Sequence, residues 1–223
     1  MSEIITILNQ KGGCGKTTTS VNLGAALAQL GRKVLVIDID PQGNATTSLG
    51  INKSEIETST YALLLGKCSF DEAIMETSTP NLYVIPSNIS LSGAEMELTK
   101  EIGYHYILNE KIEDKCNMFD YVFIDAPPSL SILTLNALVA TDSVIIPIQS
   151  EFYALEGLSQ LIHTINLVQE RLNPNLQMEG VVFTMYDVRT KLSNQVVEHV
   201  KENLDTKIYE TMIPRNIRLA EAP

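Results

Sequence analysis

Short apolar runs recur along the chain, separated by stretches with helical character. The runs lie at residues 4–8, 34–37, 82–85, 121–124, 143–148 and 180–185. Each run is nearly continuous in apolar character instead of alternating with polar residues, which is typical of a parallel sheet covered on both faces. We therefore predict that these runs form the strands of one buried, mostly parallel sheet.

Two of the intervening stretches predict long helices. Residues 17–30 are rich in alanine and leucine and stop at Gly31, a residue typical of helix C-termini, and residues 154–171 carry apolar side chains at helical spacing. Strands that alternate with helices form right-handed βαβ crossovers. The predicted fold class is α/β, a doubly wound sheet with helices on both faces and its ligand site beyond the carboxyl ends of the strands.

Composition limits the class of protein further. The chain has 223 residues, 44% of them apolar, which is enough for one well-buried domain over residues 1–223. No apolar run reaches the roughly 18 residues of a membrane span, and the N-terminus lacks a basic-then-apolar leader, so we expect a cytoplasmic protein. A formal charge of −11 disfavours a broad grip on nucleic acid, so any DNA contact has to be a local patch.

A glycine-rich run, KGGCGKTT, joins the first predicted strand to the first long helix. Its glycines leave main-chain N–H groups open to phosphate oxygens, and the helix N-terminus adds partial positive charge. This loop consists of Lys11, Gly12, Gly13, Cys14, Gly15, Lys16, Thr17 and Thr18. In such a loop Lys16 reaches the β- and γ-phosphates, Thr17 gives its hydroxyl to Mg²⁺, and Thr18 contacts the α-phosphate.

The loop departs from the ordinary GxxxxGK[ST] pattern, because Gln10 stands where the first glycine belongs. With its extra lysine, Lys11, the run resembles the deviant phosphate loop of the ParA and MinD family of P-loop ATPases. In that family the extra lysine crosses a dimer interface to the partner's nucleotide. The resemblance therefore implies a P-loop NTPase-like fold, ATP and Mg²⁺ as cofactors, and an ATP-dependent homodimer completed by Lys11.

Aspartates follow two of the predicted strands, in DIDPQGN from residue 38 and DAPPSL from residue 125. Carboxylates at strand ends beside a phosphate loop hold magnesium, directly or through water, and orient the attacking water. The resemblance implies that Asp40 activates or positions that water, that Asp38 supports the metal, and that Asp125 is the Walker B carboxylate. We expect slow, concentration-dependent turnover, because the site is incomplete without a second subunit.

The resemblance extends over three blocks of sequence, and the last two favour one branch of the family, the chromosome-partitioning ParA proteins often called Soj. The three blocks cover residues 9–50, 119–161 and 213–223. The resemblance implies that Pro214 and Asn216 line the nucleotide base and that Arg189 and Arg218 contribute to non-specific DNA binding by the ATP-bound dimer. It also implies a ParB-like centromere-binding partner that triggers hydrolysis and release, and association with the nucleoid in the ATP-bound state.

Three other members of the same superfamily are less compatible with the sequence. A MinD-like membrane-associated regulator needs a C-terminal amphipathic helix, which is lacking here, so we expect no stable membrane anchor. A nitrogenase-type reductase needs two cysteines per subunit for an iron–sulfur cluster, and neither Cys68 nor Cys116 follows a strand-end motif. A bacterial tyrosine kinase would carry a tyrosine-rich tail, whereas the tyrosines here are dispersed.

Two features depart from the family pattern. The chain stops at Pro223, where members usually continue through another strand and helix, so we expect those two elements to be missing. Cys14 stands where relatives commonly carry valine. A thiol at a helix N-terminus ionises more readily than a free one, so one hypothesis is that alkylation of Cys14 blocks ATP binding and that ATP protects it. The alternative is that Cys14 is a small filler.

Overall fold

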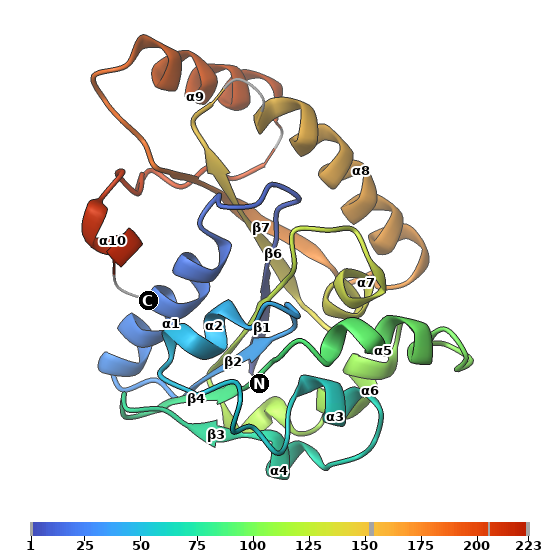
Figure 1. The fold of residues 1–223 in the computed structure, drawn as a ribbon. Helices are drawn as coiled ribbons and strands as arrows, with labels where there is room; N and C mark the ends of the chain where they lie inside the picture. Colours follow the sequence, from blue (N-terminus) through green and yellow to red (C-terminus); the bar gives the residue numbers. More distant parts are fainter. Residues whose placement is uncertain (1, 152–153, 205, 222–223) are drawn as a thin grey trace.

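The computed structural model describes residues 2–151, 154–204 and 206–221. These residues form a seven-stranded sheet of order β3-β4-β2-β5-β1-β6-β7, in which every pairing is parallel except β3 with β4 (Figure 1). The strands are β1 (Glu3–Ile7), β2 (Val34–Asp38), β3 (Met75–Glu76), β4 (Leu82–Ile85), β5 (Tyr121–Asp125), β6 (Ser143–Gln149) and β7 (Gln177–Thr184).

Helices cover both faces of the sheet. One face carries α1 (Lys16–Gln29) and α2 (Asn44–Ser48). The remaining helical segments are α3 (Thr60–Leu64), α4 (Phe70–Ala73), α5 (Leu91–Leu98), α6 (Ile107–Ile112), the 3₁₀ helix η1 (Cys116–Met118), α7 (Ile132–Val139), α8 (Ala154–Arg171), α9 (Lys191–Asn203) and α10 (Ile217–Glu221). Of these, α3 to α9 and η1 contribute to the apolar core on the opposite face. None of the described helices is long and apolar enough to cross a lipid bilayer.

Strand β2 explains why the apolar runs are continuous. Val34 and Val36 belong to the core cluster beneath α1, whereas Leu35 and Ile37 belong to the cluster on the other face, and all four are fully buried. Successive side chains of a strand point to opposite faces, so a strand buried on both faces has to be apolar at every position. The predicted α/β fold class and its mostly parallel sheet are confirmed.

The helix and strand predictions hold with small shifts at the ends. Helix α8 has the predicted bounds, and α1 begins and ends one residue earlier than expected. The sequence pattern missed β3, a two-residue antiparallel strand at the edge of the sheet. A segment this short has no periodicity to detect, and only its pairing with β4 makes it a strand.

The sheet brings three loops together at one edge. Strand β5 lies between β1 and β2, and its last residue, Asp125, is level with Ile7 of β1 and with Asp38 of β2. The connections that follow β1, β2 and β5 therefore leave the sheet side by side. This is the carboxyl edge of the parallel strands, where doubly wound folds bind their ligands.

The C-terminal segment returns to the same edge. After α9 the chain runs beside β7, with parallel bridges from Val181 to Ile208 and from Tyr186 to Pro214. Leu219 of α10 then lines a cavity together with Thr18 and Thr19 of α1. Residues more than 190 positions apart in sequence therefore enclose one space.

Candidate nucleotide-binding site

The glycine-rich loop has the backbone that phosphate binding requires. It connects β1 to α1, and Gly15 is the residue immediately before the helix. Gly13 and Gly15 have φ angles of 70° and 92°, in the left-handed region that side chains with a Cβ avoid. Glycine at these two positions lets the loop take this path without strain. Main-chain N–H groups of such a loop and of the first turn of the helix that follows can bind phosphate oxygens.

The two lysines of the loop lie in different environments. Lys16 is 7% exposed, and its Nζ donates to the main-chain oxygen of Lys11 at 3.1 Å. The Lys11 side chain is partly exposed, and its Nζ forms an ion pair with Oε2 of Glu151 at 2.7 Å. Lys16 is thus fixed within the loop, while Lys11 is held on the surface by a carboxylate that the sequence analysis did not single out.

Two side chains from distant strands fix the loop. Thr184, the last residue of β7, donates its hydroxyl to the main-chain oxygen of Cys14 at 2.7 Å. Gln149, the last residue of β6, donates Nε2 to the main-chain oxygen of Gly13 at 3.0 Å. Sequence reasoning missed both residues. The only available signal was that each is a polar residue at the carboxyl end of a predicted apolar run.

The environment of Cys14 contradicts the hypothesis of a readily ionised thiol. Cys14 is 1% exposed, and burial raises its pKa, although the charge of Lys16 acts in the opposite direction. Loss of hydration penalises the thiolate more than the positive neighbours and the helix N-terminus favour it. The alternative interpretation, that Cys14 is a small filler, fits this environment.

A labelling experiment checks this correction. We expect iodoacetamide to modify Cys14 more slowly than the partly exposed Cys68 in the folded protein at neutral pH, because the buried thiol is both inaccessible and protonated. Peptide mass spectrometry after timed quenching measures both rates, and unfolding in urea should bring them close together. Faster labelling of Cys14 than of Cys68 in the native state would contradict this view of the loop.

The Walker B candidate is connected to the first turn of α1. Asp125 accepts hydrogen bonds from Thr17 Oγ1 at 2.7 Å and from Ser20 Oγ at 2.8 Å. Burial raises the pKa of Asp125, and it also raises that of Asp38, where the charge of Asp125 adds to the effect. Two buried carboxyl groups whose ionised forms are disfavoured indicate a place where a cation would be stabilised.

The donor set suits magnesium in a phosphate site. Thr17 and Asp125 offer a hydroxyl and a carboxylate, the hard oxygen ligands that Mg²⁺ prefers. The described part of the chain contains no group of three or more His, Cys, Asp or Glu side chains that could hold a metal ion alone. This agrees with a magnesium ion that takes most of its ligands from phosphate oxygens and water.

The two aspartates after β2 differ in their surroundings. Asp38 is fully buried, and its carboxylate accepts hydrogen bonds from the main-chain N–H of Asp40 at 3.1 Å and from Thr46. Asp40 is 7% exposed, and its Oδ1 accepts from the N–H of Gln42 at 2.9 Å. Asp38 therefore shapes its own loop, and its support of a metal stays a prediction.

A cavity of about 280 Å³ lies against the start of α1 and extends the loop site. Its lining includes Gly15, Thr18, Thr184, Met185, Pro214 and Asn216. The structure thus brings the two residues predicted to contact the base close to the loop. Met185 has a φ angle of 51°, rare for a residue with a side chain, which marks this part of the lining as strained.

The two predicted DNA-binding arginines are both exposed. The Arg189 side chain is 84% exposed and donates two hydrogen bonds to Asp187, at 2.9 and 2.7 Å. These bonds hold the pKa of Asp187 at about 2. Arg218 lies in α10, and the bridge from Tyr186 to Pro214 brings its segment beside the loop that carries Arg189. Asp187 is a partner that sequence reasoning missed.

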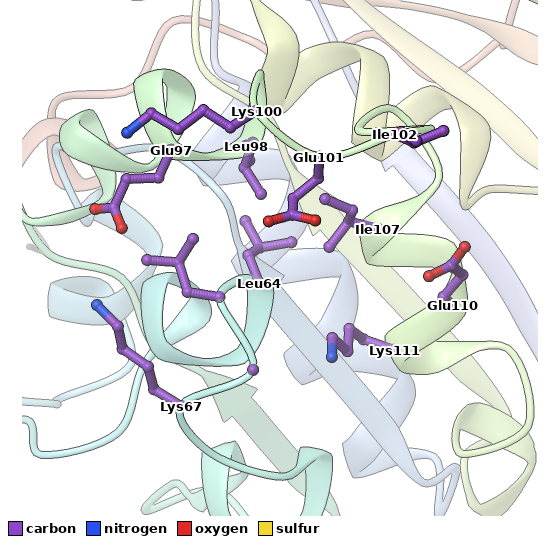
Figure 2. Close-up of a pocket in the computed structure, with 12 residues that line it drawn as sticks. Leu64, Lys67, Glu97, Leu98, Lys100, Glu101, Ile102, Ile107, Glu110 and Lys111 are labelled. Carbon is purple, nitrogen blue, oxygen red and sulfur yellow. The ribbon is translucent and has the colours of Figure 1, made fainter.

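A second cavity, of about 440 Å³, lies among α3, α5 and α6 and contains none of the predicted site residues. Figure 2 shows Leu64, Leu98 and Ile107 surrounded by charged side chains. The charged residues are Lys67, Lys100, Lys111, Glu97, Glu101 and Glu110. Positive and negative charges are balanced, so the electrostatics of this cavity favour no one class of ligand.

A phosphate loop that opens a helix beside strand-end aspartates of a parallel sheet defines a P-loop nucleotide-binding protein. A family model described as an AAA domain matches residues 2–178. The sporulation initiation inhibitor protein Soj of Bacillus subtilis is 54% identical over the whole chain, which spans 88% of that relative. The chromosome partitioning protein ParA of Caulobacter vibrioides is 49% identical over 99% of this chain and 83% of its own. The chain belongs to the ParA/Soj family of ATPases.

Solved structures agree with this assignment. The cobyrinic acid a,c-diamide synthase of Mycobacterium smegmatis, with bound ADP and magnesium, has a TM-score of 0.93 and 39% identity, covering 98% of this chain and 89% of its own. The ATP complex of Cyanothece McdA(D38A) has a TM-score of 0.91 and 25% identity, covering 99% of this chain and 86% of its own. These relatives have the same fold throughout the length of the chain.

Proposed function

We propose that this protein is a ParA-type ATPase of chromosome or plasmid partitioning. In this proposal ATP closes a sandwich dimer that binds DNA non-specifically, and a ParB-like centromere-binding partner stimulates hydrolysis and releases the dimer. The observation that carries the proposal is the loop with a buried Lys16 and a surface Lys11, set beside Asp125 in a chain 54% identical to Soj.

In this proposal ATP extends from the phosphate loop into the neighbouring cavity. The main-chain N–H groups of the loop and Lys16 bind the phosphates, and the base occupies the cavity that includes Pro214 and Asn216. Thr17 and Asp125 hold Mg²⁺, which supplies charge neutralisation on the β- and γ-phosphates. Support for the nucleotide and metal comes from the donor set described above and from the relative that binds ADP with magnesium.

Hydrolysis then depends on positioning and charge. Asp40 lies at the same edge of the sheet as Asp125 and is slightly exposed, so its carboxylate can accept a hydrogen bond from the attacking water. Lys11 of a second subunit adds positive charge opposite the growing charge on the transferred phosphoryl group. Before it can do so, Lys11 has to leave Glu151 of its own subunit. Dimerisation and catalysis are therefore coupled through one side chain.

DNA binding is a local property of a chain with a formal charge of −11. Arg189 and Arg218 are exposed, and Arg189 forms an ion pair with Asp187. Binding that depends on a few phosphate contacts weakens as the salt concentration rises. We expect association with the nucleoid only in the ATP-bound dimer, where two copies of the patch act together.

A pair of substitutions checks the DNA-binding patch. We expect Arg189→Glu to weaken DNA binding by the ATP-bound protein by about tenfold or more, and to lower the slope of log affinity against log salt by roughly one per subunit. Asp187→Asn should tighten binding, because it frees the guanidinium from its carboxylate. Fluorescence anisotropy measures both, with light scattering to verify that dimerisation persists. Changes of the same sign in the two variants would contradict the patch.

The experiment that tests the proposed function compares DNA binding with ATP, with ADP and without nucleotide. We expect retention on DNA with ATP alone, because the other two states lack the γ-phosphate that closes the dimer. Equal retention in all three states would contradict the proposal. The alternative, a MinD-like membrane-associated regulator, predicts co-sedimentation with anionic liposomes in the presence of ATP. Sequence identity supports partitioning, since the relatives described as Soj or ParA are 45–54% identical to this chain.

A further inference from the structure

A closed ring of hydrogen bonds lies directly behind Asp40. Thr46 Oγ1 donates to Asp38 Oδ2 at 2.7 Å, and Asp38 Oδ1 accepts from the N–H of Asp40 at 3.1 Å. Ser87 completes the ring, because its hydroxyl donates to the main-chain oxygen of Asp40 at 2.8 Å and its N–H donates to Thr46 Oγ1 at 2.8 Å. Thr46, Asp38 and Ser87 are all fully buried.

Thr46 is the centre of this ring. It binds Asp38 Oδ2 twice, through its hydroxyl and through its N–H at 2.8 Å, which fixes the orientation of the carboxylate. Its hydroxyl also accepts the bond from Ser87, so one oxygen atom connects the segments after β2 and β4. Removing that oxygen would leave a buried N–H of Ser87 without its acceptor and a carboxylate oxygen with one donor fewer.

The ring controls the main chain of Asp40 from both sides. The N–H of Asp40 donates to Asp38, and its carbonyl oxygen accepts from the hydroxyl of Ser87 and from the N–H of Gly43 at 2.9 Å. Among the described residues, the Asp40 carboxylate accepts one hydrogen bond, from the N–H of Gln42. The direction of the Asp40 side chain depends on the position of its backbone, and the ring supplies two of the hydrogen bonds that hold this backbone.

We propose that Thr46 is a positioning residue for ATP hydrolysis, which acts through Asp38 and Ser87 to aim the carboxylate of Asp40. This inference rests on the proposed ATPase function and deepens it. Thr46 lies in α2, and it does not line either of the two cavities described above. The hydrogen bonds of its side chain join it to Asp38 and Ser87 and not to the phosphate loop, so its loss should affect the chemical step more than nucleotide binding.

Thr46→Val keeps the shape of the side chain and removes the hydroxyl, whereas Thr46→Ser keeps the hydroxyl. We expect Thr46→Val to lower kcat by about tenfold to a hundredfold, with ATP affinity changed by less than about threefold, as for lost supporting contacts around other catalytic groups. Thr46→Ser should retain most of the activity. The matched control is Thr47→Val, because exposed Thr47 donates only to Gly43 within its own segment, at 3.2 Å, and should keep wild-type kcat.

Phosphate release at saturating ATP gives kcat, and a fluorescent ATP analogue gives affinity. Equal kcat for Thr46→Val and wild type would overturn the inference, as would parallel losses of kcat and ATP affinity. If Thr46→Val fails to fold, Ser87→Ala decides. That variant removes only the bond to the Asp40 carbonyl, so lower kcat at unchanged affinity supports the inference and unchanged kcat overturns it. Absence of hydrolysis by the wild-type protein would instead overturn the proposed ATPase function.

Discussion

Asp40→Ala is expected to leave the protein locked on DNA in the presence of ATP. The substitution removes the carboxylate proposed to position the attacking water, while the phosphate loop, Thr17 and Asp125 remain to bind ATP with Mg²⁺. Hydrolysis should fall by about a hundredfold to ten-thousandfold, the range typical of a lost general base. The ATP-bound dimer then forms but does not return to monomers, because it does not hydrolyse its ATP.

Two measurements on the same samples test this prediction. Phosphate release reports hydrolysis, and retention on immobilised DNA after ATP addition reports the trapped state. Asp71→Ala is the matched control, because Asp71 is an exposed aspartate of α4, outside the predicted site. If Asp40→Ala loses DNA binding together with hydrolysis, Asp40 serves nucleotide binding or dimerisation instead of the chemical step.

Lys11→Ala should have the opposite effect on assembly. We expect the variant to bind ATP, because Lys16 and the loop backbone are unchanged. It should stay monomeric, and its rate of ATP hydrolysis per subunit should not depend on the protein concentration. The reason is that the sandwich dimer loses the amine that neutralises phosphate charge from the facing subunit. Light scattering with ATP measures the mass, and Lys115→Ala, which changes another exposed lysine, is the control. Dimerisation of Lys11→Ala equal to that of the wild type would contradict the account.

The ion pair between Lys11 and Glu151 is compatible with this role. The two side chains are 35% and 49% exposed, and surface ion pairs of this kind contribute about 1 kcal/mol or less. A second subunit with bound ATP offers several negative charges in place of one. The pair can therefore hold Lys11 in the monomer without preventing its transfer across the interface.

The central strands and the loop could be predicted from the sequence because their signals are local. Continuous apolar runs identify strands buried on both faces, as in β2, and a glycine-rich run between a strand and a helix identifies a phosphate site. The same reasoning placed Asp38 and Asp125 at one edge, and the register confirms that they are level. Strand β3 escaped because it exists only through its pairing.

The supporting residues of the site could not be predicted, because their contacts join distant parts of the chain. Thr184 meets Cys14 across 170 positions, and Lys11 meets Glu151 across 140. The residues next to Thr184 and Glu151 in the sequence do not indicate such contacts. The two alternatives for Cys14 could not be decided from the sequence for a related reason: the helix N-terminus is visible in the sequence, whereas the burial that raises the thiol pKa is not.

The central claim is that each active site is completed by Lys11 of the neighbouring subunit. Mixed dimers of Lys11→Ala and Asp40→Ala subunits, isolated through two different affinity tags, test it most directly. Each variant alone should be almost inactive. In the mixed dimer, the site of the Lys11→Ala subunit keeps its own Asp40 and faces an intact Lys11, so we predict that hydrolysis returns well above the level of either parent. Mixed dimers no more active than the two parents would contradict the claim and indicate that Lys11 acts within its own subunit.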